Sequence, residues 1–194
     1  KETSKLFDFF KRNQNILGLT GVLILLIIVF SLIAPNFLTT SNFIDVFRQM
    51  SMIAIIAIGM TMVIITAEID LSVGSLVAAS SAVLGYLSIT IGLNIWLAIL
   101  LTIIMGGISG WTIGFLRNRY GIPSFITSLG WLSVWRGVAY LITGGFPIPP
   151  FPTSFSFIGS GFIGPIPFVV ILMIALYILF YFVLSKMPFG RYVY

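Results

Sequence analysis

The chain has 194 residues, of which 59% are apolar and only 8% are charged, whereas an ordinary soluble domain is about 25% charged. A soluble core of this size would need a charged surface that the sequence does not supply, so the composition indicates a membrane protein. The net charge of +5 does not indicate nucleic-acid binding, because the basic residues flank apolar runs and form no patch interleaved with aromatics. The chain contains no cysteine and no histidine, so any enzymatic chemistry would have to use serine, threonine, tyrosine and the few carboxylates. We expect no catalytic site, no metal site and no cofactor.

Six apolar segments follow one another along the chain, at residues 16–34, 46–66, 73–91, 95–116, 124–143 and 167–184. Each is close to the roughly 20 residues that a helix needs to cross about 30 Å of hydrocarbon. The runs are continuous and do not alternate with polar residues, so they predict helices and not a β-barrel. The first is longer than the core of a signal peptide and has no cleavage site after it. The predicted fold class is all-α, a polytopic transmembrane helical bundle.

The basic residues predict the orientation of these segments. If the N-terminus is cytoplasmic and all six segments cross, only Arg48 lies near the outer face, and Arg136 falls within the fifth segment. The remaining basic residues then lie inside, as the positive-inside rule requires: Lys1, Lys5, Lys11, Arg12, Arg117, Arg119, Lys186 and Arg191. We therefore expect residues 1–15 to be a cytoplasmic segment and residues 16–184 to be the transmembrane domain of a longer polypeptide.

Two acidic residues, Glu68 and Asp70, lie between the second and third apolar segments. A carboxylate at the centre of a membrane helix costs roughly 2.5–3.5 kcal/mol, so both need a partner, water or an interfacial location. Residues 67–72 are therefore either an interfacial turn or a deeper break that lines a cavity, as in many transporters. Asp70 either caps the third helix or serves transport or coupling, together with Ser72. Glu68 has no capping role, which favours a salt bridge or a pore contact.

Arg136 lies 12 residues after Ser124, or about 18 Å along a helix, past the midplane and toward the outside. It has three possible roles: snorkelling to an interface that Trp131 and Trp135 would suit, pairing inside the protein, or lining the translocation path. In the fourth segment, Gly106, Gly110 and Gly114 lie on one helical face at four-residue spacing. This spacing predicts close helix packing, with a flexible gate as the alternative.

The connection at residues 144–164 is rich in proline, glycine and phenylalanine. Because proline cannot continue a helix, we expect irregular or polyproline-like structure there, on the outer side. The connection is either a surface that binds a partner or a lid that packs on the helices of the chain itself.

The stretch Gly59-Met-Thr-Met-Val-Ile-Ile-Thr-Ala-Glu-Ile-Asp-Leu-Ser-Val-Gly-Ser75 resembles the signature of the membrane permease subunits of bacterial ABC sugar importers. These are the permeases of the ribose, xylose, arabinose, galactose and rhamnose type, distantly similar to branched-chain amino acid permeases. Residues 36–43, 121–130 and 136–145 fall in the order found in this family. Ribose-type permeases commonly have two glycines where this chain has Ala67 and Glu68.

The resemblance implies a type II-like ABC importer permease for a monosaccharide, a multi-pass protein of the bacterial inner membrane that works by alternating access. Its implied partners are a second permease subunit, which would form a homodimer, cytoplasmic ATPase subunits and an external sugar-binding protein. It also makes residues 185–194 the start of a cytoplasmic coupling region. No phosphate-cradling G-x-x-x-x-G-K-[ST] motif occurs, so ATP hydrolysis is expected in another chain.

Three other functions compete with this interpretation. An ion- or proton-coupled carrier would need deep titratable groups, for which only Glu68, Asp70 and Arg136 are available. A membrane-embedded enzyme is disfavoured by the missing histidine and cysteine. A permease of the same family for another small solute, such as a branched-chain amino acid or a signalling sugar, would share every feature above.

Overall fold

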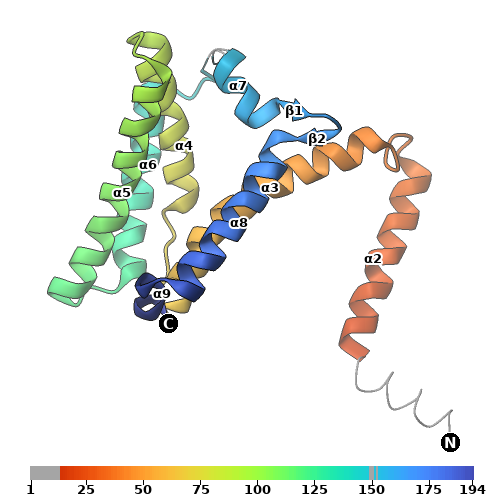
Figure 1. The fold of residues 1–194 in the computed structure, drawn as a ribbon, viewed down its shortest axis with the longest axis horizontal. Helices are drawn as coiled ribbons and strands as arrows, with labels where there is room; N and C mark the ends of the chain where they lie inside the picture. The colour runs from red at the N-terminus through yellow and green to blue at the C-terminus, as the bar shows by residue number, and fades with distance from the viewer. Residues whose placement is uncertain (1–13, 149–150, 152) are drawn as a thin grey trace, which may run out of the picture. The chain divides into compact units, whose positions relative to one another are not determined.

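The computed structural model describes residues 14–148, 151 and 153–194, and these are mostly helical (Figure 1). The long helices are α2 (Gln14–Ile33), α3 (Thr40–Ile65), α4 (Val73–Gly85), α5 (Ile95–Tyr120), α6 (Ser124–Thr143) and α8 (Phe168–Lys186). A π-helix, η1 (Tyr86–Thr90), continues α4, and two short helices are α7 (Thr153–Ser160) and α9 (Pro188–Val193). Strands β1 (Phe162–Ile163) and β2 (Ile166–Pro167) form a small antiparallel pair.

All six predicted apolar segments are helical. Five helices are long and apolar enough to cross a membrane: α3, α4 with η1, α5, α6 and α8. The first predicted segment corresponds to α2, whose described apolar part, Gly18–Ile33, is a shorter helix. The prediction of a polytopic all-α membrane protein is therefore confirmed. The predicted N-terminal segment lies outside the described residues, apart from Gln14 and Asn15, which begin α2.

The chain divides into two compact units, residues 1–49 and 50–194. In the first unit, the turn after α2 ends at Thr39, whose hydroxyl accepts a hydrogen bond from the Asn42 amide at 3.3 Å. Such a bond satisfies one of the free amides at a helix start. The Asn42 side chain also donates to the Phe37 carbonyl at 2.7 Å, which fixes the turn against the start of α3.

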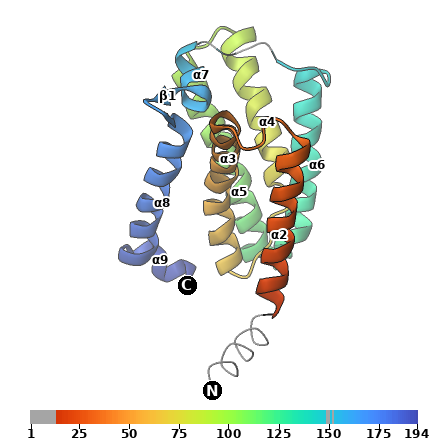
Figure 2. The ribbon, with the colours of Figure 1, turned by 90° about the vertical axis from the view of Figure 1, so that its right-hand side faces the viewer.

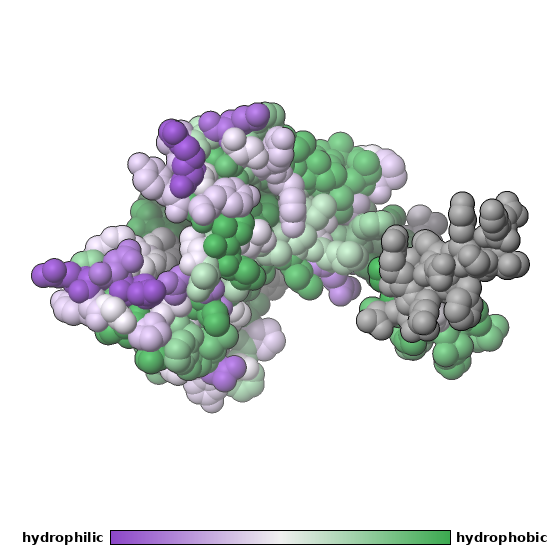
Figure 3. Space-filling model, turned by 90° about the horizontal axis from the view of Figure 1, so that it is seen from below, coloured by the Kyte–Doolittle hydropathy of each residue, from purple (hydrophilic) through white to green (hydrophobic). Residues whose placement is uncertain are grey.

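In the second unit, α4, α5 and α6 lie side by side (Figures 1 and 2). Most of their buried positions are small residues, among them Ala79, Ala82, Ala98, Ser109 and Ser128. Small residues let membrane helices approach closely. Most of the large apolar side chains are exposed instead. Apolar residues cover much of the visible surface, and strongly hydrophilic ones gather in a few patches (Figure 3). This inversion is typical of a surface that meets lipid.

The α5–α6 turn and the α8–α9 connection lie at the same end of the second unit (Figures 1 and 2). Basic residues occupy the last turns of three of the helices that end there: Arg117 and Arg119 in α5, Lys186 in α8 and Arg191 in α9. Gly121, with φ 69°, ends α5, and α6 begins directly after Pro123. The second unit therefore carries these charges on one face, as the positive-inside prediction requires.

The connection at residues 144–164 is more regular than the prediction of irregular structure. Residues 149, 150 and 152 lie outside the described part, but α7 and β1 occupy its second half. The run from Thr153 to Ser160 contains no proline. Prolines that lie before the first turn of a helix do not prevent the helix from forming. The prediction extended the effect of the prolines too far along the chain.

Candidate functional site

Residues 66–72 connect α3 to α4 and carry the acidic pair that the sequence singled out. The connection begins with Ala67 at φ 57°, the single non-glycine residue with positive φ among the described residues. The left-handed conformation costs a non-glycine residue roughly 1–2 kcal/mol. The amides of Ala67 and Glu68 bond the carbonyls of Ile64 and Val63 at 2.9 and 3.1 Å and close the end of α3. Ala67 thus adopts a glycine-like conformation at a position where the resembling permeases commonly have glycine.

The connection then runs without regular secondary structure along the start of α6. The Ile69 amide donates to the Ser124 hydroxyl and the Leu71 amide donates to the Ser128 hydroxyl, both at 3.1 Å. Ser124 and Ser128 are one turn, or about 6 Å, apart along α6, and both are buried. The two hydroxyls therefore provide hydrogen bonds to backbone amides that lie outside a helix.

Glu68 forms an ion pair with Arg117 at the end of α5, with Oε1 and Nε 2.8 Å apart. Both side chains are partly exposed, 29% for Glu68 and 46% for Arg117. The Ser124 hydroxyl, and then Arg117, lower the pKa of Glu68 below its ordinary value against the opposing effect of burial. The pair ties the connection to α5, while Ser124 ties it to α6.

Asp70 is not itself the N-cap of α4. That position belongs to Ser72, which is fully buried and makes no side-chain capping bond to the helix. The Asp70 carboxylate oxygen Oδ1 instead accepts from the Ser72 amide at 2.7 Å and from its hydroxyl at 2.6 Å. Asp70 therefore orients Ser72, the N-cap residue that directly precedes α4. The Ser72 side chain makes no capping bond to the amides of the first turn.

A pocket of about 190 Å³ brings Glu68, Asp70, Arg117 and Ser124 together with Gly110 and Gly114 of α5. Ser72 does not line it. A Cβ atom built on Gly106, Gly110 or Gly114 would meet no atom of the described residues within 4 Å. Close packing at these glycines remains a prediction.

Arg136 lies in a different place from the acidic pair. It is exposed on α6 and lines a pocket of about 260 Å³ with Leu132 and Ala139 of the same helix and with four residues of the connection and α4: Leu71, Gly74, Ser75 and Ala78. No hydrogen bond or ion pair joins Arg136 to any of the described residues. The structure therefore shows no pairing of Arg136 within the described part of the chain.

The tryptophans near Arg136 are arranged differently from an interfacial belt. Trp135 is only 8% exposed, and its indole nitrogen Nε1 donates to the Ser109 hydroxyl of α5 at 2.9 Å. Trp131 stacks on it with ring centroids 5.0 Å apart. Trp135 thus connects α5 to α6 inside the bundle.

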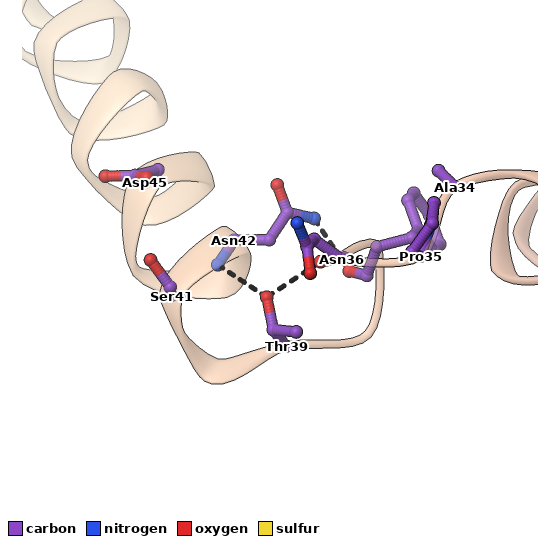
Figure 4. Close-up of a pocket in the computed structure, with 8 residues that line it drawn as sticks. Ala34, Pro35, Asn36, Thr39, Ser41, Asn42 and Asp45 are labelled. Carbon is purple, nitrogen blue, oxygen red and sulfur yellow. Dashed lines mark hydrogen bonds between the residues drawn. The ribbon is translucent and has the colours of Figure 1, made fainter.

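The first unit has a polar pocket of its own, at residues 34–45 between α2 and α3 (Figure 4). Its lining includes Asn36, Ser41 and Asp45. Thr39 and Asn42 take part in the local hydrogen bonds that form the turn and cap α3. Asp45 pairs with Arg48 one turn later on the same helix, at 3.6 Å. These polar groups are explained by the start of α3.

The sequence pointed to Glu68 and Asp70 but not to the residues that hold them. Arg117 was predicted only as a cytoplasmic charge, and Ser124 and Ser128 were not singled out. The sequence signal for this contact is the pair of serines, Ser124 and Ser128, one turn apart at the start of an apolar helix. Serine hydroxyls on one face of a membrane helix can hydrogen-bond a neighbouring segment.

Comparisons with known proteins agree with these features. The family described as branched-chain amino acid transport system / permease component matches residues 42–194. Among curated proteins, the chain is 35% identical to the ribose import permease protein RbsC of Haemophilus influenzae, over 89% of the chain and 54% of that protein. It is 37% identical to the "Probable ABC transporter permease protein YphD" of Escherichia coli, over 96% of the chain and 56% of that protein.

A third relative is the D-allose transport system permease protein AlsC of Escherichia coli, which is 32% identical over 91% of the chain and 55% of its own length. The chain spans about half the length of the curated relatives it matches. No solved structure matched the chain significantly. On the family match and these identities, the chain belongs to the permease component family of branched-chain-amino-acid-type transport systems and is a polytopic helical membrane protein.

Proposed function

We propose that the chain is part of the transmembrane permease subunit of an ATP-driven, binding-protein-dependent importer of a monosaccharide, located in a bacterial inner membrane. The observation that carries this proposal is the similarity, over about nine-tenths of the chain, to permeases whose names specify ribose and D-allose. The proposed partners are a second copy of the permease, cytoplasmic ATPase subunits and an extracytoplasmic sugar-binding protein. ATP hydrolysis takes place in the ATPase subunits, so the permease itself is not an enzyme.

The geometry supports an alternating-access mechanism, in which helices rearrange as the ATPase subunits close and open. Side chains from α5 and α6 hold the α3–α4 connection, through Arg117 on one side and Ser124 and Ser128 on the other. A movement of α5 relative to α6 therefore acts directly on Glu68, Asp70 and Ser72. We assign these three residues to the transport pathway or to its coupling.

A permease for another solute is the second candidate, because the matching family is described by branched-chain amino acid transport. The sugar-named relatives favour a monosaccharide over this alternative.

The test is reconstitution of the full-length permease with its ATPase and binding protein in vesicles that contain ATP. We expect binding-protein-dependent uptake of D-ribose or D-allose, and no uptake of L-leucine. Uptake of L-leucine would show that the transported solute is an amino acid and not a monosaccharide. Uptake driven by an ion gradient in the absence of ATP would reject the ATP-driven mechanism.

The acidic turn is tested in the same vesicles with Glu68→Gln, Asp70→Asn and Arg117→Gln. We expect reduced uptake per ATP hydrolysed for Glu68→Gln and Arg117→Gln, because both break the same ion pair. Arg119→Gln is the matched control, since it removes a neighbouring charge that forms no ion pair with the described residues. Wild-type uptake and ATP hydrolysis in all of the variants would leave the turn as a purely structural connection.

A further inference from the structure

The position of Arg136 requires an explanation that the acidic turn does not give. A charged side chain near the centre of a membrane helix costs roughly 2.5–3.5 kcal/mol. Arg136 lies about 18 Å from the start of α6 and about 10 Å from its end at Thr143, counted at 1.5 Å per residue. Because the residue is exposed, its guanidinium meets lipid, water or another molecule.

The direction of the side chain argues against escape to the nearer membrane face. Side chains on an α-helix lean toward its N-terminus, and in the predicted orientation the start of α6 is cytoplasmic. Arg136 therefore leans back into the membrane. The pocket that it lines agrees, because it includes Leu71 and Gly74 from the connection and the first turn of α4.

No described carboxylate forms an ion pair with Arg136. Arg117 pairs with Glu68, and Asp70 accepts from Ser72. The remaining described carboxylate, Asp45, pairs with Arg48. The guanidinium is thus a hydrogen-bond donor group that still needs oxygen acceptors.

The other walls of the pocket leave room for a small solute. Gly74, Ala78 and Ala139 have little or no side chain, and Ser75 provides a hydroxyl that has no partner among the described residues. The volume of about 260 Å³ lies just below the roughly 300–1,000 Å³ of pockets that hold drug-sized ligands. It suits a solute of a few heavy atoms or one side of a sugar ring.

We propose that Arg136 of α6 and Ser75 of α4 form a weak contact site for adjacent hydroxyl oxygens of the transported monosaccharide. The guanidinium offers several N–H donors in a fixed plane, a geometry that fits two neighbouring oxygens. The serine hydroxyl both accepts and donates. Hydrogen bonds to neutral hydroxyls are weaker than those to an anion, so the sugar is held on its path and still released. This inference rests on the proposed function.

The test is protection of an introduced cysteine in the reconstituted full-length transporter. Residues 1–194 contain no cysteine, and any cysteine elsewhere in the protein is first replaced by serine. Ala139→Cys puts a thiol in the pocket, and a membrane-impermeant methanethiosulfonate reagent reports whether water reaches it. The matched control is Val134→Cys, two residues from Arg136 on the same helix but not in the pocket lining. We expect D-ribose to slow modification at position 139 and to leave position 134 unaffected.

The role of the guanidinium is tested by adding Arg136→Lys to Ala139→Cys. Lysine keeps the charge but loses the planar set of donors, so folding and water access should be retained. We expect the D-ribose concentration that gives half protection to rise about tenfold, as for the loss of one hydrogen bond. An unchanged half-protecting concentration would overturn the assignment to Arg136.

Other results also decide the proposal. No modification at position 139 from either side means that the pocket faces lipid or a protein interface, and overturns it. If the isolated binding protein slows modification but D-ribose does not, the pocket is a protein contact and the proposal is overturned. If sulfate slows modification but D-ribose does not, the pocket is an anion site and the proposal is overturned. Ribose uptake without protection rejects this site and leaves the proposed function intact. Absence of sugar uptake by the wild type rejects the proposed function, and the site with it.

Discussion

The amide nitrogen of Leu71 lies 3.1 Å from the hydroxyl oxygen of Ser128, although the two residues are 57 positions apart in the chain. Ser128 is fully buried, and its hydroxyl also lies within 3.1 Å of the Phe125 carbonyl of its own helix. One side chain therefore satisfies both an interrupted backbone and the helix beside it. This bond places the start of α4 against α6, and so fixes the position of Ser75 opposite Arg136.

Substitution of Ser128 by alanine should destabilise the protein. The variant leaves the Leu71 amide without a partner in a part-buried place, and an unsatisfied buried donor costs about 1–3 kcal/mol. The measurement is thermal unfolding of the purified full-length permease in detergent. Ser133→Ala is the control, because this exposed serine bonds only the Leu129 carbonyl of its own helix. Equal melting temperatures for the two variants would contradict the role of Ser128.

The bond between Trp135 and Ser109 predicts a non-additive pair of substitutions. Trp135→Phe keeps an aromatic ring but leaves the buried Ser109 hydroxyl without its indole donor, which should cost about 1–3 kcal/mol. Ser109→Ala alone should also destabilise, because the indole N–H then lacks an acceptor. The double variant should lose less than the sum, since neither polar group remains. Additive losses in thermal unfolding would show that the bond contributes nothing to the contact between α5 and α6.

Two glycines should respond in opposite ways to alanine. A Cβ atom at Gly190 would collide with the Leu184 carbonyl at the α8–α9 connection, whereas one at Gly110 would meet no described atom within 4 Å. Gly190→Ala should therefore lower the yield of folded protein, and Gly110→Ala should not. The measurement is the monodisperse fraction after purification.

The larger substitution Gly110→Leu then tests the predicted packing face of α5. If a helix outside the described residues packs there, this variant should lower the yield of assembled transporter, because leucine forces the backbones apart. Normal assembly would mean that the face meets lipid or a roomy cavity.

The membrane spans could be predicted from the sequence, because hydrocarbon forces each apolar run into a helix. For example, α4 begins at Val73 and α6 ends at Thr143, the positions that the apolar runs predict. The need of Glu68 for a partner was also predictable, since an unpaired carboxylate is costly between two apolar segments.

The identity of the partners was not predictable, because it depends on how helices pack. Arg117 is 49 positions from Glu68, and Ser124 is 55 from Ile69. No local periodicity encodes such pairings, and the basic end of α5 has a sufficient explanation in membrane topology alone. Trp135 was mistaken for an interfacial residue for a similar reason, since its partner Ser109 lies on another helix.

The Glu68 carboxylate predicts how stability changes with pH. The Ser124 hydroxyl and Arg117 lower its pKa in the folded protein, so the unfolded chain binds a proton at a higher pH than the folded one does. The resulting stabilisation is present above the ordinary glutamate pKa of about 4.3 and is lost as the pH falls through the folded pKa. Because the pair is partly exposed, we expect a contribution of about 0.2–1 kcal/mol.

Thermal unfolding of the full-length permease and its Glu68→Gln variant, measured from pH 7 down to pH 3, tests this prediction. The wild type should melt at the higher temperature between pH 7 and about pH 5. The gap should begin to narrow near the ordinary glutamate pKa of about 4.3 and close as the pH falls through the lower pKa of Glu68 in the folded protein. High salt should narrow the gap at neutral pH, since it screens exposed pairs. Arg117→Gln should narrow the same gap but not abolish it, because the Ser124 hydroxyl also lowers the pKa of Glu68, whereas Arg119→Gln should keep the gap. A gap of constant size across the whole pH range would mean that the charge of Glu68 does not hold the α3–α4 connection in place.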